Sequence, residues 1–88
     1  MNICFDVDEC LVDKGKPIDA NVELLNVLNK SHKVYMWSGN GFEHACEIAG
    51  DLGLLDIIDG VLNKYNTFKP DIAFDNQEID LGKVNIKI

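Results

Sequence analysis

The stretch ICFDVDECLV, residues 3–12, is the starting point for predicting the fold of this chain. Its apolar run ends on two acids one residue apart, Asp6 and Asp8, before apolar residues resume at Leu11. Acids are poor strand formers and neighbouring carboxylates repel each other, so this placement needs a compensating positive charge. The run has no helical period and therefore predicts a short buried strand over residues 2–6 that ends at a polar site.

Length and composition narrow the classes of protein. The 88 residues are expected to form a single domain, residues 1–88, of ordinary globular composition. The formal net charge of −7 argues against broad nucleic-acid binding, which needs a basic face. No apolar run approaches the roughly 20 residues that span a bilayer, so no membrane partner is expected. An odd number of cysteines, without zinc-ligand spacing or a signal peptide, predicts reduced thiols in a cytoplasmic protein.

Strand and helix patterns alternate along the chain. Strands are expected over residues 2–6, 33–37, 59–63, 71–75 and 83–88. Helices are expected over residues 20–31 and from Asn40 to Gly53. The second strand is apolar on both faces, which is typical of a parallel strand that is covered on both sides. The whole pattern predicts an α/β fold of three layers with a mainly parallel central sheet.

Local signals mark the ends of the expected helices. Asp19 is a candidate N-cap for the first helix, after a loop over residues 13–19. Asn40, with an acid three residues later, has the spacing of a capping box for the second helix, and Gly53 is a favourable C-terminal stop. The expected tail strand ends at Ile88 and suits a sheet edge. Together with the small core, this edge leaves homodimer formation open.

Polar residues follow three of the expected strands. They are Asp6 and Asp8 after the first, Ser38, Gly39 and Asn40 after the second, and Asp75 and Asn76 after the fourth. In open parallel sheets, ligands bind at the carboxyl ends of the strands, where the strand order reverses. The sequence therefore predicts that these clusters meet at one edge of the sheet and form one site.

Four stretches, taken in order, resemble the motifs of the haloacid dehalogenase superfamily. FDVDECLV resembles the first motif, an apolar strand with paired acids, and VYMWSGN resembles the second, an apolar strand that ends in serine or threonine. Lys69 in TFKPD lies where the third motif places its lysine, and LGLLDIIDGVLNK is similar to a stretch that is common before that lysine. IAFDNQEID resembles the fourth motif, an apolar strand that ends in acids. The resemblance covers most of the chain and implies a Rossmann-like fold, here minimal and without a cap domain.

The resemblance implies a phosphatase that works through an aspartyl-phosphate. Asp6 would attack phosphorus, and Asp8 would protonate the leaving oxygen and then activate water. For this role, the neighbouring acid would raise the pKa of Asp8. Ser38 would donate a hydrogen bond to a phosphoryl oxygen, and the backbone N–H groups of Gly39 and Asn40 would bind the same anion.

Two cations complete the implied site. Lys69 would offset charge on the phosphoryl oxygens and hold the nucleophile in place. Mg²⁺ would be the second cation, because it favours oxygen ligands and neutralises charge on a transferred phosphoryl group. Its expected ligands lie at the ends of two strands: Asp6, Asp8 through its backbone carbonyl, Asp75 and Asn76. Asp80 is an alternative ligand, since Asn76 stands where the family commonly has a second acid.

The implied function is a Mg²⁺-dependent phosphohydrolase whose phosphorylated substrate the sequence does not identify. Without a cap, the site is expected to be open, which suits a large phosphate or closure by a partner subunit. Two other functions stay open: a metal-binding or regulatory module that has lost turnover, and a receiver-like signalling domain. The receiver is disfavoured because the third expected strand ends in Asn63 and Lys64, without the acid that such a domain phosphorylates there.

Overall fold

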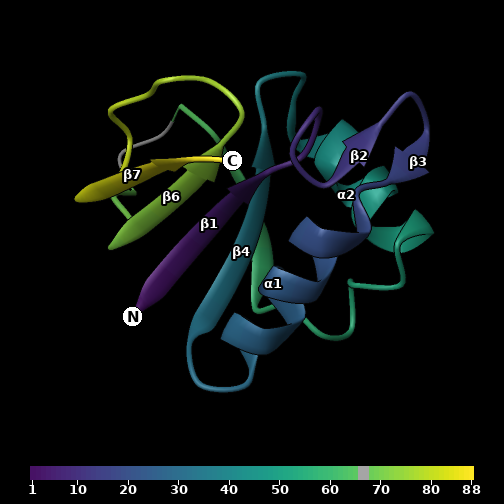
Figure 1. The fold of residues 1–88 in the computed structure, drawn as a ribbon, viewed down its shortest axis with the longest axis horizontal. Coiled ribbons are helices and arrows are strands. Elements are labelled where there is room, and N and C mark those ends of the chain that lie inside the picture. The colour runs from purple at the N-terminus through teal and green to yellow at the C-terminus, as the bar shows by residue number, and fades with distance from the viewer. Residues whose placement is uncertain (66–67) are drawn as a thin grey trace.

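A parallel sheet forms the centre of the protein (Figure 1). The structure is a computed structural model that describes residues 1–65 and 68–88. Within these residues the sheet has five strands: β1 (Asn2–Asp6), β4 (Lys33–Ser38), β5 (Gly60–Asn63), β6 (Ile72–Asp75) and β7 (Val84–Lys87). They lie in the order β5-β4-β1-β6-β7, and every neighbouring pair is parallel. The expected parallel sheet is confirmed, and the strand order reverses at β1.

The helices α1 (Asp19–Asn29) and α2 (Phe42–Asp51) pack on the same face of this sheet. Leu25 of α1 and Ala45 of α2 belong to one buried cluster with Phe5 of β1 and Met36 of β4. The helices connect β1 to β4 and β4 to β5, so both crossovers run toward the same edge (Figure 1). Neither of these helices, the two in the described residues, has the length and hydropathy of a membrane-spanning segment.

The other face of the sheet is covered without a helix among the described residues, so the expected three-layer arrangement is wrong. Trp37 and Cys4 are buried on this face, beneath Phe68 and Leu81 from the segments that flank β6. The connection from β6 to β7 has only eight residues, 76–83, whereas a helical crossover needs a dozen or more. Short apolar loops therefore replace the third layer.

The expected loop over residues 13–19 contains a small hairpin instead. Strands β2 (Val12–Asp13) and β3 (Lys16–Pro17) pair antiparallel. Lys14 and Gly15 connect them, with φ angles of 51° and 77°. Positive φ at both turn residues is the geometry that matches the twist of a two-residue hairpin.

Both helices begin without the N-terminal caps that the sequence predicts, whereas the predicted C-terminal stop of α2 is present. Ile18 precedes α1 without a side-chain cap, and Asp19 is the first helical residue, so the expected Asp19 cap is wrong. Gly41 precedes α2 without a side-chain cap, so the expected capping box is also wrong, because the Asn40 amide bonds to Asp8 instead. Gly53, with a φ of 70°, follows the end of α2, as expected.

Candidate functional site

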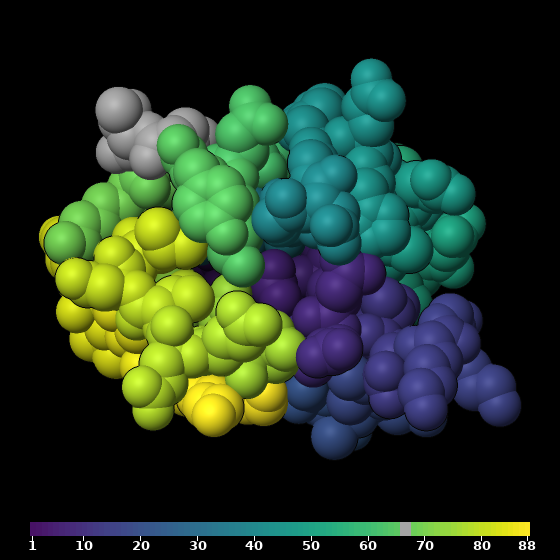
Figure 2. Space-filling model, turned by 90° about the horizontal axis from the view of Figure 1, so that it is seen from above, coloured from purple at the N-terminus to yellow at the C-terminus, as the bar shows by residue number. Residues whose placement is uncertain are grey.

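A hollow of about 260 Å³ opens at the carboxyl edge of the sheet, around the end of β1. Figure 2 looks down on this edge: the purple segment after β1 lies at the bottom of the hollow, between the segments after β4, β5 and β6. The lining residues come from these four segments: Asp6, Asp8, Glu9, Gly39, Asn40, Lys64, Tyr65, Asp75, Asn76 and Gln77. The polar clusters that the sequence assigns to one edge do meet there.

Lys64 lies between two buried carboxylates in this hollow. Its Nζ is 3.0 Å from Asp6 Oδ1 and 2.7 Å from Asp75 Oδ2. The pairing of β1 with β6 brings the two acids together, because Phe5 and Phe74 are partners in register. The side chains of Lys64, Asp6 and Asp75 are 8%, 7% and 1% exposed. The ammonium group thus supplies the positive charge that the acids at the end of β1 require.

Burial and ion pairing act in opposite directions on the pKa values of this cluster. Burial raises the pKa of Asp6, the ammonium of Lys64 lowers it, and the charge of Asp75 raises it again, so the pKa of Asp6 lies above its usual range. Burial lowers the pKa of Lys64, but its contacts with both carboxylates outweigh burial and raise it. Lys64 contacts both acids, whereas Asp6 contacts one ammonium and lies near a second negative charge. Lys64 therefore stays charged beside a carboxylate of raised basicity.

Asp8 faces a different set of partners on the α2 side of the hollow. Its Oδ2 accepts hydrogen bonds from Ser38 Oγ at 3.2 Å and Asn40 Nδ2 at 2.9 Å. His44 Nε2 lies 2.9 and 3.0 Å from the two Asp8 oxygens. Burial raises the pKa of Asp8, but the hydrogen bonds from His44 and Asn40 lower it, and the net shift is downward. The expectation that a neighbouring acid raises the pKa of Asp8 is wrong, because the hydrogen bonds that Asp8 accepts outweigh its burial.

Asp8 is expected to titrate below its ordinary pKa of about 3.9, and His44→Ala to move the Asp8 pKa upward. Because the folded pKa is the lower one, the contribution of Asp8 to stability is present above the ordinary pKa and is lost as the pH falls through the folded value. Carboxyl ¹³C chemical shifts followed against pH measure this. His32→Ala is the control, since His32 lies at the other end of the sheet. A wild-type Asp8 that titrates above about 3.9 would contradict the geometry.

The expected phosphate-binding residues lie at the end of β4. Gly39 and Asn40 line the hollow. Ser38 is buried, its hydroxyl donates to Asp8, and its Oγ accepts the backbone N–H of Asn40 at 3.0 Å. Asn76 also lines the hollow, but its Nδ2 donates to Glu9 Oε2 at 2.9 Å. The end of β4 therefore gathers around Asp8, and Asn76 engages Glu9 at the rim.

Lys69 and Asp80 are not brought to this hollow. Both are exposed and neither lines it. Of the stretch TFKPD, residue 67 lies outside the described residues. Lys64 occupies the position expected for Lys69, and His44 is a second site residue that sequence reasoning did not assign. The stretch LGLLDIIDGVLNK ends on Lys64, so the signal for this lysine was present in the sequence.

The donor set suits a Mg²⁺ ion that keeps most of its waters. Asp6 and Asp75 line the hollow and approach one common atom, so two hard oxygen ligands are available together. Mg²⁺ commonly binds through one or two carboxylates and water. Within residues 1–65 and 68–88, no group of three or more His, Cys, Asp or Glu side chains is arranged to hold a metal. An ion at Asp6 and Asp75 would therefore share these acids with Lys64.

Cys10, buried beside the site, is not a competing nucleophile. Burial, with the nearby charges of Asp6 and Asp75, raises the pKa of the Cys10 thiol to about 12. The thiolate is the reactive form of cysteine, and almost none is present at neutral pH. Cys10 is therefore present as the neutral thiol.

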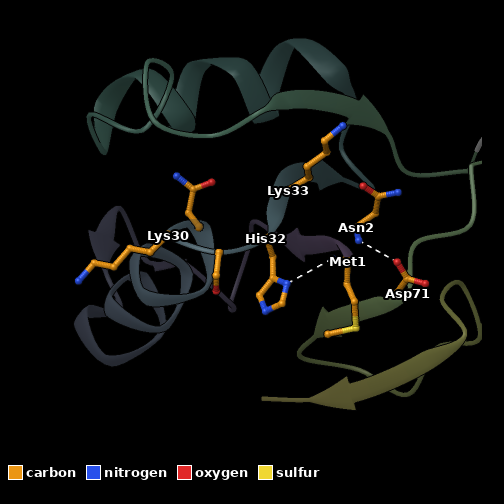
Figure 3. A pocket seen from close by; sticks show the side chains of 8 residues that line it. Met1, Asn2, Lys30, His32, Lys33 and Asp71 are labelled. Atoms are coloured by element: carbon orange, nitrogen blue, oxygen red, sulfur yellow. Dashed lines mark hydrogen bonds between the residues drawn. The ribbon is translucent and has the colours of Figure 1, made fainter.

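A larger hollow, of about 550 Å³, lies at the opposite edge, where the strands begin (Figure 3). Its one lining acid, among the described residues, is Asp71, which accepts a hydrogen bond from the backbone N–H of Asn2 at 2.8 Å. His32 Nδ1 lies 3.2 Å from the amino nitrogen of Met1. Ligands of open parallel sheets bind at the other edge, so the smaller hollow is the candidate site.

Comparisons of this chain with protein-family models, with curated proteins and with solved structures find no match.

Proposed function

We propose that this protein is a Mg²⁺-dependent phosphohydrolase that acts through an aspartyl-phosphate on Asp6. One observation carries the proposal: two buried carboxylates from adjacent parallel strands converge on one buried ammonium, at an open edge of the sheet. A carboxylate can serve as a nucleophile toward phosphorus, and fixed positive charge is the main means by which proteins accelerate phosphoryl transfer.

In the first step, an Asp6 oxygen attacks phosphorus, and the bond from phosphorus to the leaving oxygen breaks. Water then attacks the phosphorus of the aspartyl-phosphate, which releases inorganic phosphate and restores Asp6. Lys64 orients Asp6 through the 3.0 Å contact and offsets charge on the phosphoryl oxygens. In this proposal Lys64 takes the role that the sequence assigns to Lys69.

Asp8 and His44 handle protons as a pair in this proposal. The lowered pKa of Asp8 makes it a carboxylate, so Asp8 alone is a poor acid for the leaving oxygen. His44 Nε2, 2.9 Å from Asp8 Oδ1, is placed to share a proton with it. The pair would give this proton to the leaving oxygen, and Asp8 would then take one from the attacking water.

The metal-binding residues of the proposal are Asp6 and Asp75, with the Asp8 backbone carbonyl as a further oxygen. Mg²⁺ bound there would neutralise negative charge on the transferred phosphoryl group.

The strand order is 3-2-1-4-5 when the parallel strands are numbered along the chain. This matches the first five strands of the Rossmann sheet and differs from the 2-1-3-4-5 order of receiver-like domains. The order supports the proposed Rossmann-like, haloacid dehalogenase-like fold over the receiver alternative.

Phosphate release from a panel of phosphomonoesters tests the proposal. We expect wild-type protein to hydrolyse p-nitrophenyl phosphate with Mg²⁺, to stop when the metal is chelated, and to resume when Mg²⁺ is restored. Wild-type protein that releases phosphate no faster than Asp6→Asn on the whole panel would overturn the enzyme assignment.

A second candidate is a metal-binding or regulatory module without turnover. The hydrogen bonds to Asp8 favour this second candidate, because they stabilise the carboxylate and so make Asp8 a weaker proton donor. Mg²⁺ titration followed by NMR, with the same panel, separates the candidates. Shifts at Asp6 and Asp75 without phosphate release identify the module, and release of phosphate rejects it.

A further inference from the structure

Tyr65 forms one wall of the hollow and has no place in the proposed chemistry. It directly follows Lys64, lines the hollow and is 74% exposed. Its ring centroid lies 5.9 Å from Lys64 Nζ. Its hydroxyl lies 3.5 Å from the position that a Cβ on Gly39 would occupy. The ring therefore extends from the end of β5 toward the turn after β4. It forms part of the wall between the Lys64 ammonium group and solvent.

Glu9 contributes negative charge to the rim of the same hollow. Its backbone has a φ of 59°, which is unusual for a residue with a side chain. Its Oε2 accepts a hydrogen bond from Asn76 Nδ2 at 2.9 Å, which fixes the carboxylate at the rim. Asn76 is neutral, and among the described residues no Lys, Arg or His forms an ion pair with Glu9. The negative charge of the Glu9 carboxylate is therefore not compensated locally.

We propose that this hollow selects phosphomonoesters whose leaving group is a planar ring without negative charge, an inference that rests on the proposed function. With phosphorus at Asp6, the group bonded to the leaving oxygen must leave the hollow past its walls, which include Tyr65 and Glu9. An exposed aromatic face is covered well by a second ring. The Glu9 carboxylate repels an anionic substituent at the same exit and tolerates a neutral or cationic one.

Paired substrates test the role of Tyr65. We expect Tyr65→Ala to lower kcat/KM for phenyl phosphate by about tenfold, through KM, and to leave ethyl phosphate within about twofold of wild type. Each variant is compared with wild type on the same substrate, so the different intrinsic reactivities of the two leaving groups do not affect the comparison. Tyr65→Phe keeps the ring and should behave as wild type, whereas Tyr65→Leu keeps bulk and should behave as Tyr65→Ala. Equal losses on both substrates would overturn the inference and leave the proposed function standing.

Non-hydrolysable ligands separate this inference from the proposed function. Binding of phenylphosphonate and methylphosphonate, measured by calorimetry with Mg²⁺ present, does not depend on turnover. We expect wild type to prefer phenylphosphonate by about tenfold, and Tyr65→Ala to lose this preference. If no phosphate is released from any substrate, the proposed function fails. The phosphonates still decide the inference: a preference that depends on Tyr65 supports it, and equal binding overturns it.

Replacement of Glu9 tests whether the hollow disfavours a negatively charged leaving group. We expect Glu9→Gln to raise kcat/KM for 4-carboxyphenyl phosphate about threefold relative to kcat/KM for phenyl phosphate, and this relative gain to be lost in high salt. Glu23→Gln, an exposed change on α1 outside the hollow, is the matched control. A gain that is equal for both substrates would show that Glu9 does not discriminate by charge.

Discussion

Replacement of Lys64 by methionine is expected to lower the free energy of unfolding by about 3–5 kcal/mol and to abolish phosphate release. The change removes the ammonium that lies 3.0 Å from Asp6 and 2.7 Å from Asp75 and leaves both carboxylates buried. Breaking a buried ion pair from one side is costly because the remaining charge has no compensation. Urea denaturation followed by circular dichroism measures the loss of stability.

Lys69→Met is the matched control for this prediction. Lys69 is exposed and lies outside the hollow, so its replacement should change the free energy of unfolding by less than about 0.5 kcal/mol and leave activity unchanged. Lys64→Arg keeps the positive charge and covers the case in which Lys64→Met does not fold. It should remain folded, with activity reduced by the different shape of the guanidinium group. An inactive Lys69→Met beside an active Lys64→Met would return the role to Lys69.

Asp6→Asn is expected to lower kcat by at least about 10³-fold while the fold is kept. An amide oxygen cannot form the aspartyl-phosphate, so the covalent route is closed. Because burial raises the pKa of Asp6, its contribution to stability is present below its ordinary pKa and is lost as the pH rises through the raised value. At neutral pH the neutral amide therefore removes a burial penalty, and Lys64 keeps its contact with Asp75.

Stability and activity of Asp6→Asn should be measured on the same preparation. We expect a free energy of unfolding within about 1 kcal/mol of wild type or above it, which separates lost chemistry from lost folding. Asp56→Asn, at an exposed acid outside the hollow, is the matched control and should keep full activity. A folded Asp6→Asn with more than a tenth of wild-type activity would remove Asp6 from the mechanism.

The sheet was predictable from the sequence because its strands are short apolar or alternating segments that end in polar residues. The expected 2–6 strand coincides with β1, and the others agree with the observed strands within one residue at each end. The covering of the second face was not predictable in this way. Apolar residues on both sides of β4 indicate that both faces are covered, but not by what, and here Phe68, Ile79 and Leu81 from loops cover the face of Trp37.

The meeting of Asp6, Asp8, Ser38 and Asp75 was predictable, since the carboxyl ends of parallel strands meet at one edge. The choice between Lys64 and Lys69 was not, because lysine is seldom buried and the sequence does not show how far each side chain reaches. His44 could have been assigned from its place in the first turn of α2, shortly after Ser38. Its contact with Asp8 depends on the angle at which α2 leaves the sheet, which periodicity does not give.

Locating the covalent adduct is the critical experiment for the proposed aspartyl-phosphate on Asp6. Beryllofluoride mimics a phosphoryl group on a carboxylate, and its bound form gives ¹⁹F signals that are distinct from those of the free ion. With Mg²⁺ present, we expect one bound species on wild-type protein, chemical-shift changes at Lys64, and no bound signal from Asp6→Asn. A bound signal that persists in Asp6→Asn, or an adduct located on Asp75, would contradict the account.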